Sequence, residues 1–184
     1  MALSAEPSVN TEESKPTASH QTDWEFFVAL SGGFQPDVHA AVGTGRIGLN
    51  RKVNRYFRPE LNLFSGADNG PITNQFFTGI RLGTRIELPR EGAVPYLWIA
   101  FAHAHETSLE AAKDNPIPIS LGLSEDGVIH RSGLDVGLGV AWEFPKVREG
   151  TMASRLGLRA SMVSLLGPGA PRTFEGLATF GVAF

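Results

Sequence analysis

The last eleven residues of the chain constrain its fold more than any other segment. In an extended strand successive side chains point to opposite faces, so every second residue shares a face. One face of this segment is apolar: Phe174, Gly176, Ala178, Phe180, Val182 and Phe184. The other carries small, polar or charged residues: Glu175, Leu177, Thr179, Gly181 and Ala183. An apolar outer face and a mixed inner face are typical of a strand that closes a membrane barrel.

Seven upstream segments show a related alternation, which predicts seven further strands. Their approximate ranges are 23–33, 38–50, 56–65, 75–88, 94–106, 128–144 and 152–166. Strands of about 11 to 15 residues are longer than the five or six typical of soluble sandwiches, and they suit a membrane crossing. The predicted fold is therefore all-β, an eight-stranded antiparallel up-and-down transmembrane β-barrel.

The segment at about 38–50 has the least regular pattern of the eight. Val42 falls on one face, whereas Ile47 and Leu49 fall on the other, with glycines between them. Because a bulge adds one residue and so shifts the phase, we expect a β-bulge at one of these glycines.

Composition sets the domain organisation and excludes some functions. Residues 1–22 are polar with scattered prolines, which predicts a disordered N-terminal tail before a single barrel domain at 23–184. The net charge of −3 gives no basis for nucleic-acid binding, and the absence of cysteine excludes thiolate metal sites. The start of the chain lacks a secretory signal peptide, and we expect that one has been removed.

The face opposite the apolar stripe carries charges of both signs. These residues form a predicted lumen charge network: Glu25, Arg58, Glu60, Arg81, Arg85, Glu87, Asp135, Glu143, Arg155, Arg159 and Glu175. In a soluble lipocalin-like barrel or sandwich the same face would point to water. Glycines such as Gly79, Gly83 and Gly139 share this face, however, and they favour the crowded interior of a narrow barrel. We therefore expect Arg/Glu pairs to plug the lumen, with no open pore.

Three segments carry a resemblance to a known family: Val94-Pro-Tyr-Leu-Trp98, Ser132-Gly-Leu-Asp-Val-Gly-Leu-Gly-Val140 and Gly181-Val-Ala-Phe184. Over residues 23–184 the chain resembles small bacterial outer-membrane barrels of the OmpA/OmpX/OmpW type. The resemblance implies location in the outer membrane among its lipids, including lipopolysaccharide. It also implies insertion by the barrel-assembly machinery, which reads a C-terminal strand ending in an aromatic residue. Here that signal corresponds to Phe184, supported by Phe180 and Val182.

The segment His103-Ala-His105-Glu106-Thr107 is the local cluster with the clearest potential for chemistry. His103 and His105 share a strand face and could chelate a metal with a third ligand. Some eight-stranded barrels are lipid A deacylases with His, Ser and Glu on the outer wall. His105-x-Thr107 with Glu125 or His130 resembles that arrangement, but threonine is a poor substitute for the serine. We interpret the two histidines as polar residues where the strand leaves the membrane, and we expect no metal, cofactor or catalytic residue.

Three classes of function are compatible with these features. The expected one is a structural or interaction barrel without enzymatic activity, whose loops at 66–74 and 107–127 or whose tail could contact an envelope protein. The first alternative is a narrow channel or hydrophobic-ligand conduit of the OmpW kind. The second alternative is a lipid A-modifying hydrolase.

Overall fold

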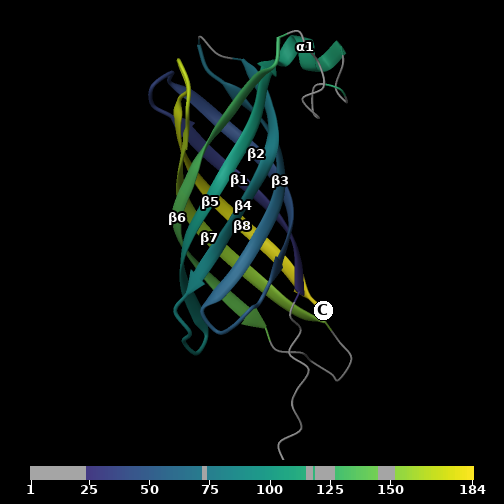
Figure 1. The fold of residues 1–184 in the computed structure, drawn as a ribbon, viewed down its shortest axis with the longest axis vertical. Coiled ribbons are helices and arrows are strands. Elements are labelled where there is room, and N and C mark those ends of the chain that lie inside the picture. Colours follow the sequence, from purple (N-terminus) through teal and green to yellow (C-terminus); the bar gives the residue numbers. More distant parts are fainter. Residues whose placement is uncertain (1–23, 72–73, 115–117, 119–126, 145–151) are drawn as a thin grey trace, which may run out of the picture.

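Eight antiparallel strands form a closed barrel in the computed structural model, and they follow one another around it in chain order (Figure 1). The structure describes residues 24–71, 74–114, 118, 127–144 and 152–184. The predicted all-β, eight-stranded, antiparallel up-and-down barrel is therefore confirmed. The predicted tail at 1–22 and most of the connection at 107–127 lie outside the described residues.

The strands are long, as the alternation predicted. Their bounds are β1 Trp24–Gln35, β2 Ala40–Arg51, β3 Phe57–Asn69, β4 Gln75–Glu87, β5 Ala93–Ser108, β6 Ile129–Phe144, β7 Ala153–Leu165 and β8 Arg172–Ala183. One short helix, α1 Leu109–Asp114, follows β5 directly. Within the described residues, no helix has the length and apolar character that a membrane crossing requires.

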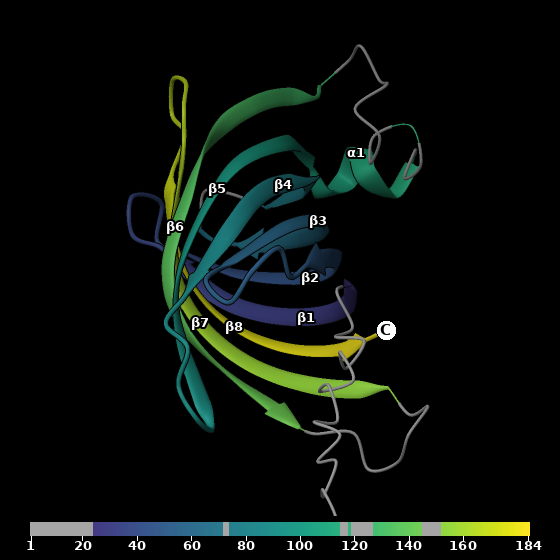
Figure 2. The ribbon, with the colours of Figure 1, turned by 60° about the horizontal axis from the view of Figure 1, so that its bottom comes forward.

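The two ends of the barrel are distinguished by the parts of the chain that lie there. β8 pairs with β1 from Glu25↔Ala183 to Phe34↔Phe174, so Trp24 and Phe184 lie at the same end, which we call the terminal end. The helix α1 and the C-terminus lie at opposite ends of the molecule (Figure 1), and we call the end that carries α1 the helix end. Turned about the horizontal axis, the strands are seen to curve around a common interior (Figure 2). The turns at 52–56 and 88–92 belong to the terminal end.

Buried and exposed residues alternate along the strands. In contrast to a soluble protein, the charged side chains are buried and the large apolar side chains are exposed. On β8, Phe174 and Phe180 are 50% and 46% exposed, whereas Glu175 between them is 5% exposed. The same inversion appears on β4, where Leu82 is exposed and Arg81 and Arg85 are buried. The outer wall is therefore apolar and the interior carries the charges.

The prediction of a bulge in β2 is wrong. The β1–β2 ladder is unbroken from Trp24↔Arg51 to Gln35↔Ala40. Val42 points into the interior, where it lines a small cavity together with other apolar residues. Because the interior near the helix end accepts apolar side chains, the change of polarity along β2 needs no change of phase.

The ends of β1 and β3 also differ from the prediction. β1 continues through Gly32 and Gly33 to Gln35, and β3 continues to Asn69 instead of ending near 65. A Cβ atom at Gly33 would meet the backbone of Phe174 and Glu175. Glycine marks a close approach of β8 here and not the end of the strand.

Several interior glycines lie where an added Cβ atom would clash with the backbone of the neighbouring strand. A Cβ atom at Gly83 would lie within 3.0 Å of Ile99 O and of Ala100, its partner across the β4–β5 ladder. At the outward-facing Gly45, by contrast, a Cβ atom would meet nothing within 4 Å. The glycines of the charged face therefore allow neighbouring strands and side chains to pack closely inside the barrel.

Replacing Gly83 with alanine is expected to destabilise the barrel by about 1–3 kcal/mol, because the added methyl group overpacks against backbone atoms. The matched variant Gly45→Ala should change the free energy of unfolding by less than about 0.5 kcal/mol. Urea unfolding followed by tryptophan fluorescence measures both. Equal effects of the two substitutions would contradict the assignment of Gly83 to a crowded interior.

Candidate functional site

The interior charges form successive clusters along the barrel, beginning at the terminal end. Here Arg58 donates hydrogen bonds to Glu25 at 3.1 Å, Glu87 at 3.2 Å and Glu143 at 3.3 Å. Arg155 bonds Glu87 at 2.5 Å and lies 3.5 Å from Glu143. Glu143 is half exposed at the mouth, whereas the other four side chains are buried. These five residues come from five different strands and tie them together across the interior.

The second cluster combines charges with aromatic rings. Glu60 lies 2.5 Å from Arg85 and 3.9 Å from Arg159, and all three are buried. The guanidinium of Arg159 lies over the ring of Trp98 at 4.4 Å, and that of Arg85 lies 5.3 Å from the Tyr96 ring. The two guanidinium groups share the single carboxylate of Glu60. Because an aromatic face attracts cations, the two rings help to stabilise the second positive charge.

The third cluster contains a residue that is missing from the predicted network. Arg81 bonds Asp135 at 2.6 Å and Glu175 at 3.2 Å. Arg46 of β2 also bonds Glu175 and lies 4.0 Å from Asp135. Arg46 was not predicted because the pattern of β2 is irregular. It lies on the same face of the strand as Val42 and Thr44.

Arg46 balances the charge of the predicted network. The eleven predicted residues comprise six carboxylates (Glu25, Glu60, Glu87, Asp135, Glu143, Glu175) and five guanidinium groups (Arg58, Arg81, Arg85, Arg155, Arg159), and Arg46 supplies the sixth cation. The structure places all eleven on the interior side and joins each to at least one partner of opposite charge. Because a buried charge is costly unless it is paired, the equal numbers make this interior tolerable.

Near the helix end the interior becomes less charged. Arg131 of β6 donates to Glu106 of β5 at 2.5 Å and to the backbone oxygen of Pro168 at 3.1 Å. Between this pair and the third cluster lies a cavity of about 30 Å³, whose lining includes Phe64 and Val163. That volume corresponds to about one water molecule.

An ion pair outside the barrel wall joins β8 to the turn between β1 and β2. The backbone N–H of Arg172 donates to Asp37 at 3.1 Å, and the guanidinium lies 3.4 Å from the same carboxylate. These hydrogen bonds, the backbone one first, hold the pKa of the Asp37 carboxyl below its usual range. Because both side chains are exposed, solvent screens the pair.

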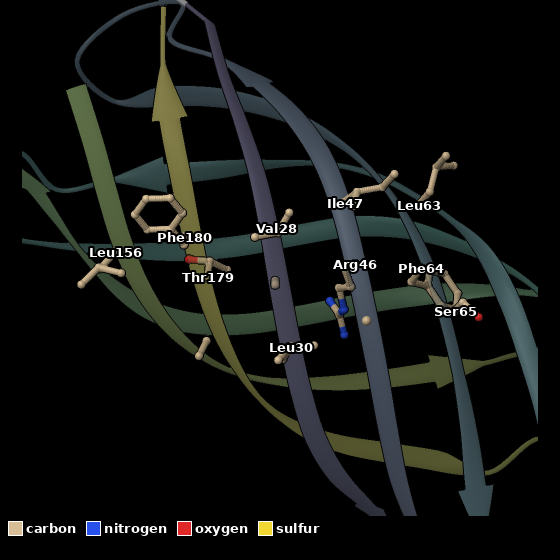
Figure 3. Close-up of a pocket in the computed structure, with 13 residues that line it drawn as sticks. Val28, Leu30, Arg46, Ile47, Leu63, Phe64, Ser65, Leu156, Thr179 and Phe180 are labelled. Carbon is tan, nitrogen blue, oxygen red and sulfur yellow. The ribbon is translucent and has the colours of Figure 1, made fainter. Parts of the chain in front are cut away.

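The outer wall carries a shallow apolar hollow of about 790 Å³ over β1, β2, β3, β7 and β8 (Figure 3). Exposed side chains that include Val28, Ile47 and Leu63 line it. Phe180, a residue of the predicted assembly signal, lies at its edge, while Val182 and Phe184 follow toward the terminal end. The N–H of Phe184 donates to the backbone oxygen of Trp24 at 2.9 Å, so the last residue is held against β1.

Three histidines converge on the outer wall near the helix end. His103 and His105 lie on β5, and His105 faces His130 of β6 across the ladder. The Nε2 atoms of His103 and His105 are 3.1 Å apart, and one nitrogen from each ring lies within 4.8 Å of the other two. His103 and His105 are half-buried and His130 is exposed. Such a group could hold a metal ion or form a hydrogen-bonded polar patch.

The structure adds Ser132 to this cluster, a residue absent from the sequence-based predictions. Its Oγ lies 3.0 Å from Nδ1 of His103. The available signal was the triplet His130-Arg131-Ser132, a His-x-Ser pattern in the strand after the long connection. Thr107, weighed in its place, is buried, and Glu125 lies outside the described residues.

Comparison with known proteins identifies the fold. No protein-family model matches the sequence, and a search of curated proteins found no match to it. Among solved structures, the chain is similar to Neisserial surface protein A (NspA), with 12% identity, 88% of this chain and 96% of that chain covered, and a TM-score of 0.57. Ail of Yersinia pestis matches with 11% identity, 88% and 97% coverage, and a TM-score of 0.47. The closed ladder and the NspA match together show that the chain has the fold of the small eight-stranded outer-membrane β-barrels.

Proposed function

We propose that the protein is an integral barrel of the bacterial outer membrane with a structural or interaction role and a closed interior. The observation that carries this proposal is the inversion of polarity, with large apolar side chains outside and paired charges inside. A soluble protein rarely exposes an apolar patch of more than a few hundred Å². An apolar wall around the whole barrel is stable where acyl chains cover it.

Aromatic residues at the terminal end support a membrane boundary there. Trp24, Phe144 and Phe184 are exposed on the outer wall at this end. Arg51 lies 5.3 Å from the Trp24 ring. Aromatic rings with nearby cations are typical of the level of the lipid headgroups. The partners in this proposal are outer-membrane lipids, including lipopolysaccharide, and the barrel-assembly machinery during insertion, with Phe180, Val182 and Phe184 as its signal.

The three interior clusters support a closed lumen and count against the channel alternative. Side chains fill the interior of an eight-stranded barrel, and here they are held by ion pairs between strands. A conduit for hydrophobic ligands would require an apolar path along the barrel. Charged residues instead occupy the interior from the first cluster, with Glu25, to the third cluster, with Asp135. The partner in the interaction role would be an envelope protein that binds either the helix end of the barrel or the N-terminal tail.

The hydrolase alternative has one observation in its favour, the contact between Ser132 Oγ and His103 Nδ1. A serine nucleophile also needs a group that orients its histidine. His103 Nε2 faces His105, and Glu106 forms an ion pair with Arg131 on the interior side. These contacts favour a role without enzymatic activity.

Two measurements test the proposal. The protein should fractionate with the outer membrane and should migrate faster on a gel when unheated than when boiled. In planar bilayers the purified barrel should give no steady conductance. Recovery as a soluble monomer without detergent would contradict the membrane assignment, whereas steady ion currents would favour the channel alternative and contradict the closed lumen.

A further inference from the structure

We propose that His103, His105 and His130 form a binding site for a divalent transition-metal ion on the outer wall near the helix end. The site goes beyond the structural role, since neither the apolar wall nor the interior clusters require three histidines here. It depends on the register of β5 and β6, which brings residues 25 or more positions apart in the chain side by side.

The strand geometry explains why the three rings meet. Residues two apart on a strand share a face, and cross-strand partners lie about 4.5–5.5 Å apart at Cβ. His105 therefore neighbours His103 along β5 and His130 across the ladder. The ring centroids of His105 and His130 are 4.7 Å apart, and those of His103 and His105 are 4.9 Å apart.

The nitrogen positions are close to those of a metal site. Zinc–nitrogen bonds of about 2.0–2.1 Å in tetrahedral geometry place the ligand nitrogens about 3.3 Å from one another. The Nε2 atoms of His103 and His105 are already at 3.1 Å, and all three ligand nitrogens lie within 4.8 Å. A small rotation of the exposed His130 ring would complete the set.

Ser132 orients the first ligand. When Nδ1–H of His103 donates to Ser132 Oγ at 3.0 Å, the lone pair of Nε2 is directed to the cluster. Metal-binding histidines usually have such a partner on their second nitrogen, which fixes the tautomer and the ring. On the interior side, the Glu106–Arg131 ion pair joins the two strands between these histidines.

The ligand set defines the class of ion. Imidazole nitrogens suit zinc, copper, nickel and cobalt, whereas magnesium and calcium prefer oxygen ligands. Three protein ligands leave a fourth position of a tetrahedral site open, and the exposure of His130 allows entry from outside the barrel.

The experiment is a titration of the full-length folded barrel, produced without a polyhistidine tag, with Co²⁺ and then Zn²⁺. We expect one equivalent of Co²⁺ to give the visible absorption of four-coordinate cobalt, and Zn²⁺ to displace it. Ser132→Ala should weaken binding by about tenfold, and His105→Gln and His130→Gln by more than that. Folding of each variant is checked by the mobility of the unheated sample on a gel.

His39→Asn is the matched control. It removes an exposed histidine at the same end of the barrel, and asparagine tolerates the positive φ of 51° at that position. It should bind Co²⁺ like the wild type. The proposal would be overturned if the wild type did not bind Co²⁺ stoichiometrically. It would also be overturned if His105→Gln and His130→Gln bound Co²⁺ with the same affinity as the wild type. If a histidine variant does not fold, the EPR spectrum of Cu²⁺ on the wild type decides, since fewer than three coordinated nitrogens would contradict the site.

Discussion

Replacing Asp135 with asparagine is expected to destabilise the folded barrel by about 3–5 kcal/mol, because removing one partner of a buried ion pair leaves uncompensated charge. Asp135 is 0% exposed, bonds Arg81 at 2.6 Å and lies 4.0 Å from Arg46. Asparagine keeps the shape of the side chain but leaves two cations with Glu175 alone. The measurement is urea unfolding of the barrel in lipid vesicles, followed by tryptophan fluorescence.

The double variant Asp135→Asn/Arg46→Gln is the control for charge balance. It leaves Arg81 and Glu175 as an intact pair at 3.2 Å, so it should recover a substantial part of the lost stability. Simple addition of the two single effects would show that the charges are not coupled. A loss of less than about 0.5 kcal/mol for Asp135→Asn would contradict the buried network itself.

Replacing Leu82 with arginine is expected to cost about 2–4 kcal/mol in lipid vesicles, because the new charge would face acyl chains near the middle of the membrane. Leu82 lies in the central part of β4, is 61% exposed, and is flanked across the ladders by Leu61 and Phe101. In a soluble barrel the same position would face water, and arginine would cost almost nothing.

Leu88→Arg is the matched control for depth. Leu88 follows β4 at the terminal end and is 64% exposed, so the two positions differ mainly in their distance from the barrel ends. Near the membrane interface arginine should cost only about 0–1 kcal/mol. Similar effects at Leu82 and Leu88 would contradict a lipid-facing wall.

Strand number and side-chain direction could be predicted because alternation is a local property. β4 and β8 show why: in their central parts Ile80, Leu82 and Phe180 alternate with charged or small residues, and the structure places the two sets outside and inside as the pattern requires. β2 could not be predicted equally well. Val42 and Arg46 share the interior face, and only the neighbouring strands show that this interior is apolar at one level and charged at another.

The histidine cluster illustrates the limit of sequence reasoning for the site. The spacing of His103 and His105 predicted a shared face, but the third histidine lies beyond a long connection. The register of β5 against β6 determines that His130 lies opposite His105 and Ser132 opposite His103. A shift of one residue would have turned His130 and Ser132 into the interior and brought Arg131 to the wall.

By itself, the sequence determined the all-β class, the eight strands and, on the strands with a regular alternation, the side of the wall on which the charges lie, because these depend on a period of two within each strand. Only the tertiary structure decided which charges pair, that Arg46 completes their balance, and that three histidines converge. Those properties depend on register and closure, which join residues as distant as Arg46 and Glu175. The apolar strand at the C-terminus thus predicted a barrel, and its pairing with β1 closes it.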